Sequence, residues 1–211
     1  SGLTTHPDLT TSGFLQKFLY RLQMPIINFI IKQSSKIIVP NEYEKNIFLK
    51  FIDESKIEII RNGIDLKQFD LEKIDFRKKY RLNDPFILFL GRFSKIKGID
   101  ILIESIKILK NQSKIKNVKF VLMGSDFGFE KQMNEMIQSY DLVDNIHIIK
   151  NPQRSEIFGA FEECLFLVLP SRWELSPLTP LEGFAFKKTV LSTTSHGIPY
   201  TLRNNVDSIL V

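Results

Sequence analysis

Short apolar runs recur along the chain from Phe86 onward, and the segments between them mix apolar and charged residues at helical spacing. Runs that are apolar at nearly every position are typical of strands buried on both faces of a sheet. The pattern therefore predicts an α/β fold with a doubly wound parallel sheet. The expected strands lie at residues 86–90, 118–123, 146–149, 164–169, 189–192 and 208–211, and the expected helices near 98–111, 128–140, 154–162 and 180–187.

Residues 14–32 are strongly apolar but are interrupted by Lys17, Arg21 and Lys32. This pattern predicts a helix with Pro25 as a kink, either buried or lying along a surface. A helix that is both basic and apolar also suits an anionic lipid surface. Peripheral membrane contact and a place in a core or between domains are therefore the two alternatives for this segment.

The next stretch predicts a smaller α/β unit. Short strands are expected at 36–39 and 57–60, with a helix over 41–51 between them. Residues 65–80 are charged and loosely patterned, which indicates a linker to the larger sheet.

The bulk properties narrow the class of protein. A chain of 211 residues with 43% hydrophobic residues can bury a full core, which excludes a disordered protein. The net charge of +5 is spread along the chain, which favours phosphate-bearing partners over nucleic acid. The one cysteine, Cys164, lies in an apolar run and is expected to be a core residue. No apolar stretch reaches the ~18 residues of a membrane span and no secretion signal is evident, so a cytoplasmic location is expected.

The first candidate site follows the expected strand at 86–90. Arg92 and Lys97 lie between this strand and the next expected helix, where free backbone N–H groups and the helix dipole favour an anion. A diphosphate would be well held there. The alternative is that both are solvated loop cations. The segment is not a P-loop, because the required glycine and lysine spacing is absent.

The second candidate site follows the expected strand at 164–169. Glu174 and Glu182 are separated by seven residues, and Pro177 and Pro180 exclude one continuous helix across them. A carboxylate accepts two hydrogen bonds, which suits the vicinal hydroxyls of a ribose or a hexose. The alternative for Glu174 is an exposed loop acid. The alternative for Glu182 is a structural capping box that begins at Thr179, with the glutamate in the first helical turn.

Other features are weaker. Residues 126–128 spell the magnesium-binding motif of kinases, but no other kinase motif accompanies them. His147 lies in an apolar strand and is expected to be part of the core. His196 precedes a loop glycine and is either solvated or near a ligand, while Gly124 is expected to permit a tight turn.

Taken in order, these segments resemble the GT-B glycosyltransferases of family 4, also called glycosyl transferases group 1. The strongest motifs are the GRFSKIKG element and the two glutamates with seven residues between them. The matching segments are 36–42 (KIIVPNE), 57–65 (IEIIRNGID), 87–98 (ILFLGRFSKIKG), 121–124, 167–182 and 197–199. The resemblance implies a GT-B fold, with a Rossmann-like sheet in the C-terminal domain and a partial N-terminal domain.

The resemblance also implies roles for individual residues. Arg92 and Lys97 would hold the donor diphosphate, Glu182 the ribose diol, and Glu174 the transferred sugar. Leu175 and Ser176 would complete the donor-binding set, and His6 matches a donor-site histidine of the N-terminal domain. The implied donor is a nucleotide-diphosphate sugar, and the implied mechanism retains configuration by front-face attack. No metal and no further cofactor are expected.

The chain is shorter than two complete Rossmann-like domains require. Residues 1–72 are therefore expected to be the end of the N-terminal, acceptor-side domain with its hinge. Residues 73–211 would be the C-terminal nucleotide-sugar-binding domain without its last helices. A chain of this extent is expected to be inactive alone.

Three functions remain open at this point. The first is transfer of a hexose from a UDP-, GDP- or ADP-sugar to a glycan, lipid-linked or small-molecule acceptor, as in the synthesis of cell-envelope polysaccharide or glycolipid. Residues 14–32 would then bring the enzyme to the inner face of the membrane. The second is a nucleotide-sugar-binding module without catalysis. The third is a phosphate-binding α/β interaction domain.

Overall fold

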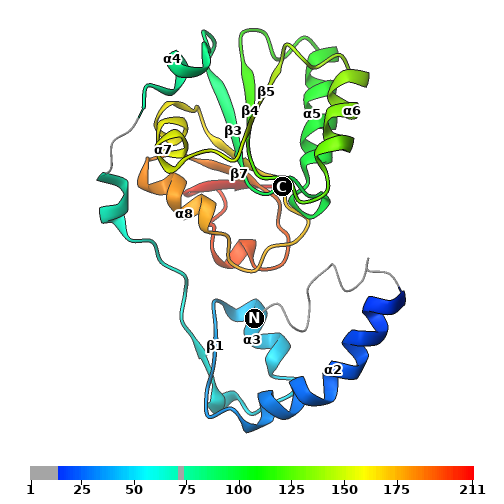
Figure 1. Cartoon of the computed structure of the whole chain (residues 1–211). Coiled ribbons are helices and arrows are strands. Elements are labelled where there is room, and N and C mark those ends of the chain that lie inside the picture. The colour runs from blue at the N-terminus through cyan, green and yellow to red at the C-terminus, as the bar shows by residue number, and fades with distance from the viewer. Residues whose placement is uncertain (1–13, 71–73) are drawn as a thin grey trace. The chain divides into compact units, whose positions relative to one another are not determined.

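The computed structural model describes residues 14–70 and 74–211, so His6 lies outside the described part of the chain. The chain forms two compact units, Ser1–Asn62 and Gly63–Val211 (Figure 1). Each unit contains a parallel sheet of its own.

The first unit is a small α/β structure. A long helix, α2 (Phe14–Gln33), contains Pro25 and precedes a parallel pair of short strands, β1 (Ile37–Val39) and β2 (Ile57–Ile59). Between the strands lie α3 (Glu42–Phe48), whose first turn is capped by the Asn41 side chain, and the 3₁₀ turn η1 (Glu54–Lys56). The core of this unit is formed by Ile27, Ile31, Val39, Phe48 and Ile57.

Both strands and both helices predicted for this part are therefore confirmed. The helix expected over 41–51 ends at Phe48, because residues beyond it form turns. Within the residues that the structure describes, no helix is long and apolar enough to cross a membrane.

The second unit is built on a parallel sheet of six strands in the order β5-β4-β3-β6-β7-β8 (Figure 1). Every neighbouring pair is parallel, which confirms the predicted doubly wound sheet. Side chains alternate between its faces, so both faces carry apolar residues and both are suited to helix packing. The strands are β3 (Phe86–Leu90), β4 (Lys119–Gly124), β5 (Ile146–Lys150), β6 (Leu167–Leu169), β7 (Val190–Ser192) and β8 (Ser208–Leu210).

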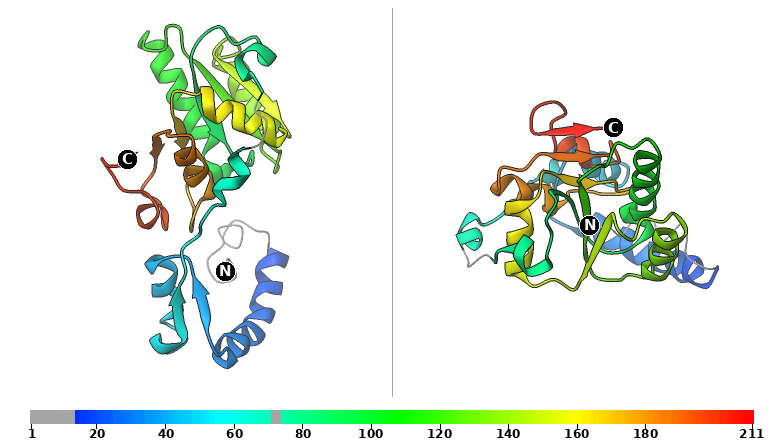
Figure 2. Two further views of the ribbon diagram at one scale, coloured as in Figure 1. Left: turned by 90° about the vertical axis from the view of Figure 1, so that its left-hand side faces the viewer. Right: turned by 90° about the horizontal axis from the view of Figure 1, so that it is seen from above.

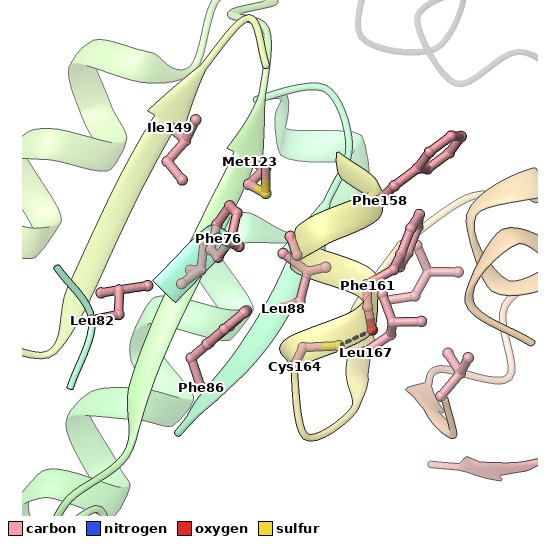
Figure 3. Packing of buried hydrophobic residues seen from close by; sticks show 14 of the residues in the cluster. Phe76, Leu82, Phe86, Leu88, Met123, Ile149, Phe158, Phe161, Cys164 and Leu167 are labelled. Atoms are coloured by element: carbon pink, nitrogen blue, oxygen red, sulfur yellow. Dashed lines mark hydrogen bonds between the residues drawn. The ribbon is translucent and has the colours of Figure 1, made fainter. Parts of the chain in front are cut away.

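Helices pack on both faces of this sheet (Figure 1 and Figure 2). α5 (Ile99–Asn111) and α6 (Glu130–Ser139) lie on one face, where Phe89, Ile103 and Met133 belong to one apolar cluster. The opposite face carries α4 (Phe76–Tyr80), α7 (Arg154–Glu163) and α8 (Leu178–Ala185). Its cluster includes Phe76, Phe86, Leu88, Phe158 and Phe161 (Figure 3).

Cys164 belongs to this second cluster, as predicted. The residue is 2% exposed, and burial raises the pKa of its thiol to about 12. Its Sγ donates a hydrogen bond to the carbonyl oxygen of Phe161 at 3.5 Å (Figure 3). His147 is half-buried with its ring centroid 5.5 Å from that of Tyr80, and burial lowers its pKa.

The prediction of a linker over 65–80 is wrong for much of that stretch. The 3₁₀ helix η2 (Leu66–Asp70) and the helix α4 form there, and Phe69 and Phe76 enter the core of the second unit. α7 holds α4 in place, because the Glu163 carboxylate accepts hydrogen bonds from the backbone N–H groups of Phe76 (2.8 Å) and Arg77 (3.0 Å). The second unit accordingly begins at Gly63, ahead of the expected boundary between 72 and 73.

Candidate functional site

The carboxyl end of β3 continues into the loop that carries Arg92 and Lys97. This loop ends in the 3₁₀ turn η3 (Lys95–Lys97) and in Gly98, whose φ is +69°. A Cβ at Gly98 would lie 1.9 Å from the carbonyl oxygen of Pro170, the residue after β6. Only glycine permits both this backbone conformation and this approach, so Gly98 brings the loop after β3 against the loop after β6.

These two loops meet in an ion pair between Lys97 and Glu174. The Lys97 Nζ donates to Oε1 of Glu174, and the Ser171 Oγ donates to the same oxygen at 3.2 Å. The two charged side chains are only 17% and 10% exposed, so water screens their attraction little. The pair places a cation and a carboxylate side by side at the carboxyl edge of the sheet, where ligands bind in open α/β sheets.

Glu174 is positioned so that part of its hydrogen-bonding capacity is unused. Its side-chain contacts with described residues all fall on Oε1, and its backbone carbonyl accepts from the Gly197 N–H at 2.9 Å. Oε2 has no partner in the described part of the chain. This oxygen can accept hydrogen bonds from a ligand without breaking the pair with Lys97.

Arg92 is exposed and lies beside a different loop. Its guanidinium carbon is 4.9 Å from the centroid of the Phe127 ring, which is itself 57% exposed. The Phe127 backbone N–H donates to the Phe93 carbonyl at 3.0 Å. The neighbouring Asp126 carboxylate accepts N–H bonds from Gly128, Phe129 and Glu130 at 2.9–3.0 Å. These bonds, that of Glu130 above all, lower the pKa of Asp126. Residues 126–128 therefore form a turn before α6, a local structural role that agrees with the lack of any other kinase motif in the sequence.

The capping-box alternative for Glu182 is wrong. α8 begins at Leu178 with Pro177 as its N-cap and no side-chain cap, so Thr179 lies inside the helix and Glu182 lies beyond its first turn. Proline is tolerated at position 180 because the first-turn N–H groups have no intrahelical partner. Glu182 instead forms an ion pair with Arg154 at the start of α7, with 3.2 Å between Oε1 and Nη1.

Two opposing effects act on the pKa of the Glu182 carboxyl. Its side chain is 16% exposed, and this burial raises its pKa, while the charge of Arg154 offsets part of the increase. The Arg154 guanidinium also lies 4.8 Å from the ring centroid of Phe158. Arg154 was not among the predicted site residues, although its place just after β5 at the carboxyl edge of the sheet is a usable indication.

The remaining predicted residues lie around the same loops. Leu175 is buried and Ser176 half-buried between Glu174 and the start of α8. His196 follows β7, with Nδ1 2.5 Å from the Ser195 Oγ and its ring centroid 6.1 Å from that of Trp173; burial lowers its pKa. Gly124 permits a close backbone approach, since a Cβ there would lie 1.8 Å from the carbonyl oxygen of Gly91.

The sheet order and the charged loops at its carboxyl edge define a Rossmann-like α/β domain of the GT-B type. The family model described as "Glycosyl transferases group 1" matches residues 70–211. The chain therefore belongs to this family.

Individual relatives agree with this assignment. An uncharacterized 41.2 kDa protein of the cps region of Klebsiella pneumoniae is 28% identical, over 93% of this chain and 53% of its own. A UDP-Gal:α-D-GlcNAc-diphosphoundecaprenol α-1,3-galactosyltransferase of Escherichia coli is 25% identical, over 87% of this chain and 49% of its own. The crystal structure of a glycosyltransferase from Rickettsia africae has a TM-score of 0.76 and 26% identity, over 90% of this chain and 52% of its own. The chain thus spans about half the length of the relatives it matches.

Proposed function

We propose that this chain is the donor-binding part of a retaining, family 4 glycosyltransferase that moves a hexose from a nucleotide-diphosphate sugar to an acceptor. The observation that carries the proposal is the Lys97–Glu174 pair with its unused carboxylate oxygen. The pair puts a cation for the phosphates next to an acceptor for a sugar hydroxyl. This matches the donor, in which the diphosphate is bonded directly to the sugar. The name of the E. coli relative, which includes UDP-Gal and a diphosphoundecaprenol acceptor, supports a UDP-sugar and a lipid-linked glycan.

In this proposal each charged residue has one task. Arg92 and Lys97 neutralise the diphosphate as it departs, Glu174 accepts from hydroxyls of the transferred sugar, and Glu182 accepts from the ribose diol. Leu175 and Ser176 lead into the N-terminus of α8, where the backbone and the helix dipole favour negative charge. The acceptor oxygen bonds to the anomeric carbon on the face from which the diphosphate oxygen leaves, and that oxygen takes the acceptor proton.

The chain alone is expected to bind a nucleoside diphosphate with a dissociation constant of about 0.1–1 mM and to transfer no sugar. Donor and acceptor must be held together for transfer. The chain spans about half the length of its relatives, and we expect the other half to hold most of the acceptor side. Isothermal titration calorimetry with UDP, GDP and ADP, followed by a transfer assay with the matching sugar nucleotides, measures both. Robust turnover by the 211-residue chain would contradict this prediction.

The same titrations separate the alternatives. Tighter binding of a nucleotide sugar than of the bare diphosphate favours a donor site over a phosphate-binding interaction domain, since only the former contacts the sugar. A longer form of the protein that binds donor but neither hydrolyses nor transfers it would be a binding module without catalysis.

We further propose that α2 brings the protein to an anionic membrane surface. Four apolar side chains lie on one exposed strip of the helix, each 58–64% exposed: Leu22, Ile26, Phe29 and Ile30. Arg21 and Lys32 flank this strip, and the opposite residues, Ile27 and Ile31, face the core of the unit. Apolar residues edged by cations fit the interface between lipid headgroups and acyl chains. The Lys17 side chain lies outside the described part.

The strip is expected to mediate co-sedimentation with vesicles that contain phosphatidylglycerol. Replacing Leu22 and Phe29 by serine should lower the bound fraction several-fold, as should Arg21→Glu with Lys32→Glu. Val143→Ser with Val206→Ser is the matched control, because both valines are exposed apolar residues of the other unit. Vesicle binding that survives the strip variants would refute the assignment of membrane contact to this strip. No vesicle binding by the wild-type protein would refute membrane contact and favour a strip covered by protein.

A further inference from the structure

Arg172 is the residue that joins the two loops of the donor site most extensively. It lies in the loop after β6, two residues before Glu174, and its backbone N–H donates to the Ile96 carbonyl at 2.8 Å. Its Nη1 donates to the Lys95 carbonyl at 2.8 Å. Nη1 and Nη2 also donate to the two carboxylate oxygens of Asp100, at 2.5 and 2.9 Å. One residue thus makes four hydrogen bonds to the loop after β3 and the first turn of α5.

These contacts lie on both sides of Lys97 in the sequence. Lys95 and Ile96 precede Lys97 directly, and Asp100 follows it by three residues. The bidentate fork restricts both distance and orientation, which a single point charge does not do. Arg172 therefore fixes the backbone on either side of Lys97 relative to the loop that carries Glu174.

The loop that carries Arg172 is also anchored on its other side. The Thr193 Oγ1 donates to the Ser171 carbonyl at 2.6 Å, and the Ser195 Oγ donates to the Arg172 carbonyl at 2.5 Å. Both donors follow β7. The Arg172 side chain therefore extends from an anchored loop to the loop after β3.

We propose that Arg172 is a positioning residue for the donor: its fork to Asp100 keeps Lys97 and Glu174 at the separation that the diphosphate and the transferred sugar require. This inference rests on the proposed function. The Arg172 side chain is 40% exposed and the Asp100 side chain 13%. The two-pronged geometry, which fixes orientation as well as distance, assigns the pair to positioning.

The test compares Arg172→Lys, which keeps the charge but loses the fork, with Asp100→Asn and with the double variant. Binding of UDP and of UMP is measured by calorimetry, with the guanosine pair in their place if GDP binds more tightly. Each single variant is expected to weaken diphosphate binding about tenfold, less than the roughly hundredfold that a misplacement of about 1 Å can cost. Monophosphate binding should change less than about twofold, because Lys97 and Glu174 act on the second phosphate and the sugar. The double variant should be no weaker than either single variant, since one interaction is lost in all three.

Arg203→Lys is the matched control, because Arg203 forms an exposed ion pair with Asp207 away from these loops, and it should change neither affinity. Amide hydrogen exchange at residues 95–98 should accelerate in the Arg172 and Asp100 variants. An unchanged ratio of diphosphate to monophosphate affinity, or unchanged exchange, would overturn the positioning role. A wild-type chain that binds none of the three diphosphates while exchange still accelerates would refute the proposed function and reduce the fork to a structural link.

Discussion

Lys97→Ala is expected to weaken nucleoside diphosphate binding by about 1.5–3 kcal/mol, the scale of one hydrogen bond to a charged group, and also to destabilise the domain. The second effect follows from the ion pair, because the substitution leaves the Glu174 carboxylate, 10% exposed, with Ser171 as its remaining described partner. Leaving a buried polar group without its partner costs about 1–3 kcal/mol. Chemical denaturation and calorimetry measure the two effects separately.

Arg92→Ala should weaken diphosphate binding without destabilising the domain. The Arg92 side chain is exposed and lies over the Phe127 ring, so its removal should change the free energy of unfolding by less than about 0.5 kcal/mol. Diphosphate binding should nevertheless weaken by about 1.5–3 kcal/mol, and in the longer enzyme the substitution should cost about 2–4 kcal/mol of transition-state stabilisation.

A double variant, Lys97→Ala with Glu174→Gln, is the internal control. Neutralising the carboxylate removes the uncompensated charge, so stability should return toward the wild-type value while binding stays weak. Diphosphate affinity that survives both Lys97→Ala and Arg92→Ala would place the phosphates elsewhere on the protein.

The sheet could be predicted from the sequence because its strands are buried on both faces and therefore appear as continuous apolar runs. The helix α4 could not be predicted, since Phe76 is one buried residue among the charges of a five-residue helix. Its first turn is held by the Asp75 side chain, which accepts from the Lys78 N–H, and by Glu163, a residue 87 positions from Phe76 in the chain. A contact between residues so far apart in the chain, such as that of Glu163 with Phe76, leaves no periodic pattern in the sequence.

The candidate site likewise contains residues that the sequence suggests and partners that it does not. Arg92, Lys97 and Glu174 could be proposed from the sequence because they lie in the loops after β3 and β6, and the carboxyl edge of a parallel sheet is where ligands bind. Their partners could not be found, since Lys97 and Glu174 are 77 residues apart and Arg172 and Asp100 are 72. For Glu182, the local Thr-Pro-Leu-Glu pattern suggested a cap, but the helix starts earlier and tertiary packing gives the glutamate Arg154 as its partner.

Glu182→Gln is expected to weaken donor binding by roughly 1–3 kcal/mol, or about one to two decades in affinity, without destabilising the fold. Glutamine keeps one acceptor oxygen but loses the charge and the second oxygen, so it cannot hold both hydroxyls of a ribose diol.

The substitution also changes how stability depends on pH. The pKa of Glu182 is raised by burial, so at pH values above this pKa the native state bears a cost of ionisation that the unfolded chain does not. Stability from this group is therefore greatest at low pH and falls as the pH rises through the folded pKa. The neutral glutamine removes that cost but also the charge attraction to Arg154.

The decisive measurement compares wild type and Glu182→Gln with ribose and 2′-deoxyribose nucleotides, together with the melting temperature of each protein. The melting temperature of the variant should match or slightly exceed that of the wild type at pH 7, since the ion pair with Arg154 offsets only part of the burial effect. Deoxyribose nucleotides should bind the two proteins with similar affinity, because the missing hydroxyl already breaks the two-point contact. Arg154→Gln serves as the control for the ion pair, as it removes the partner and leaves the carboxylate. Ribose-nucleotide affinity that is unchanged in Glu182→Gln, with a lower melting temperature in Glu182→Ala, would make the glutamate a structural partner of Arg154 and refute its assignment to the ribose.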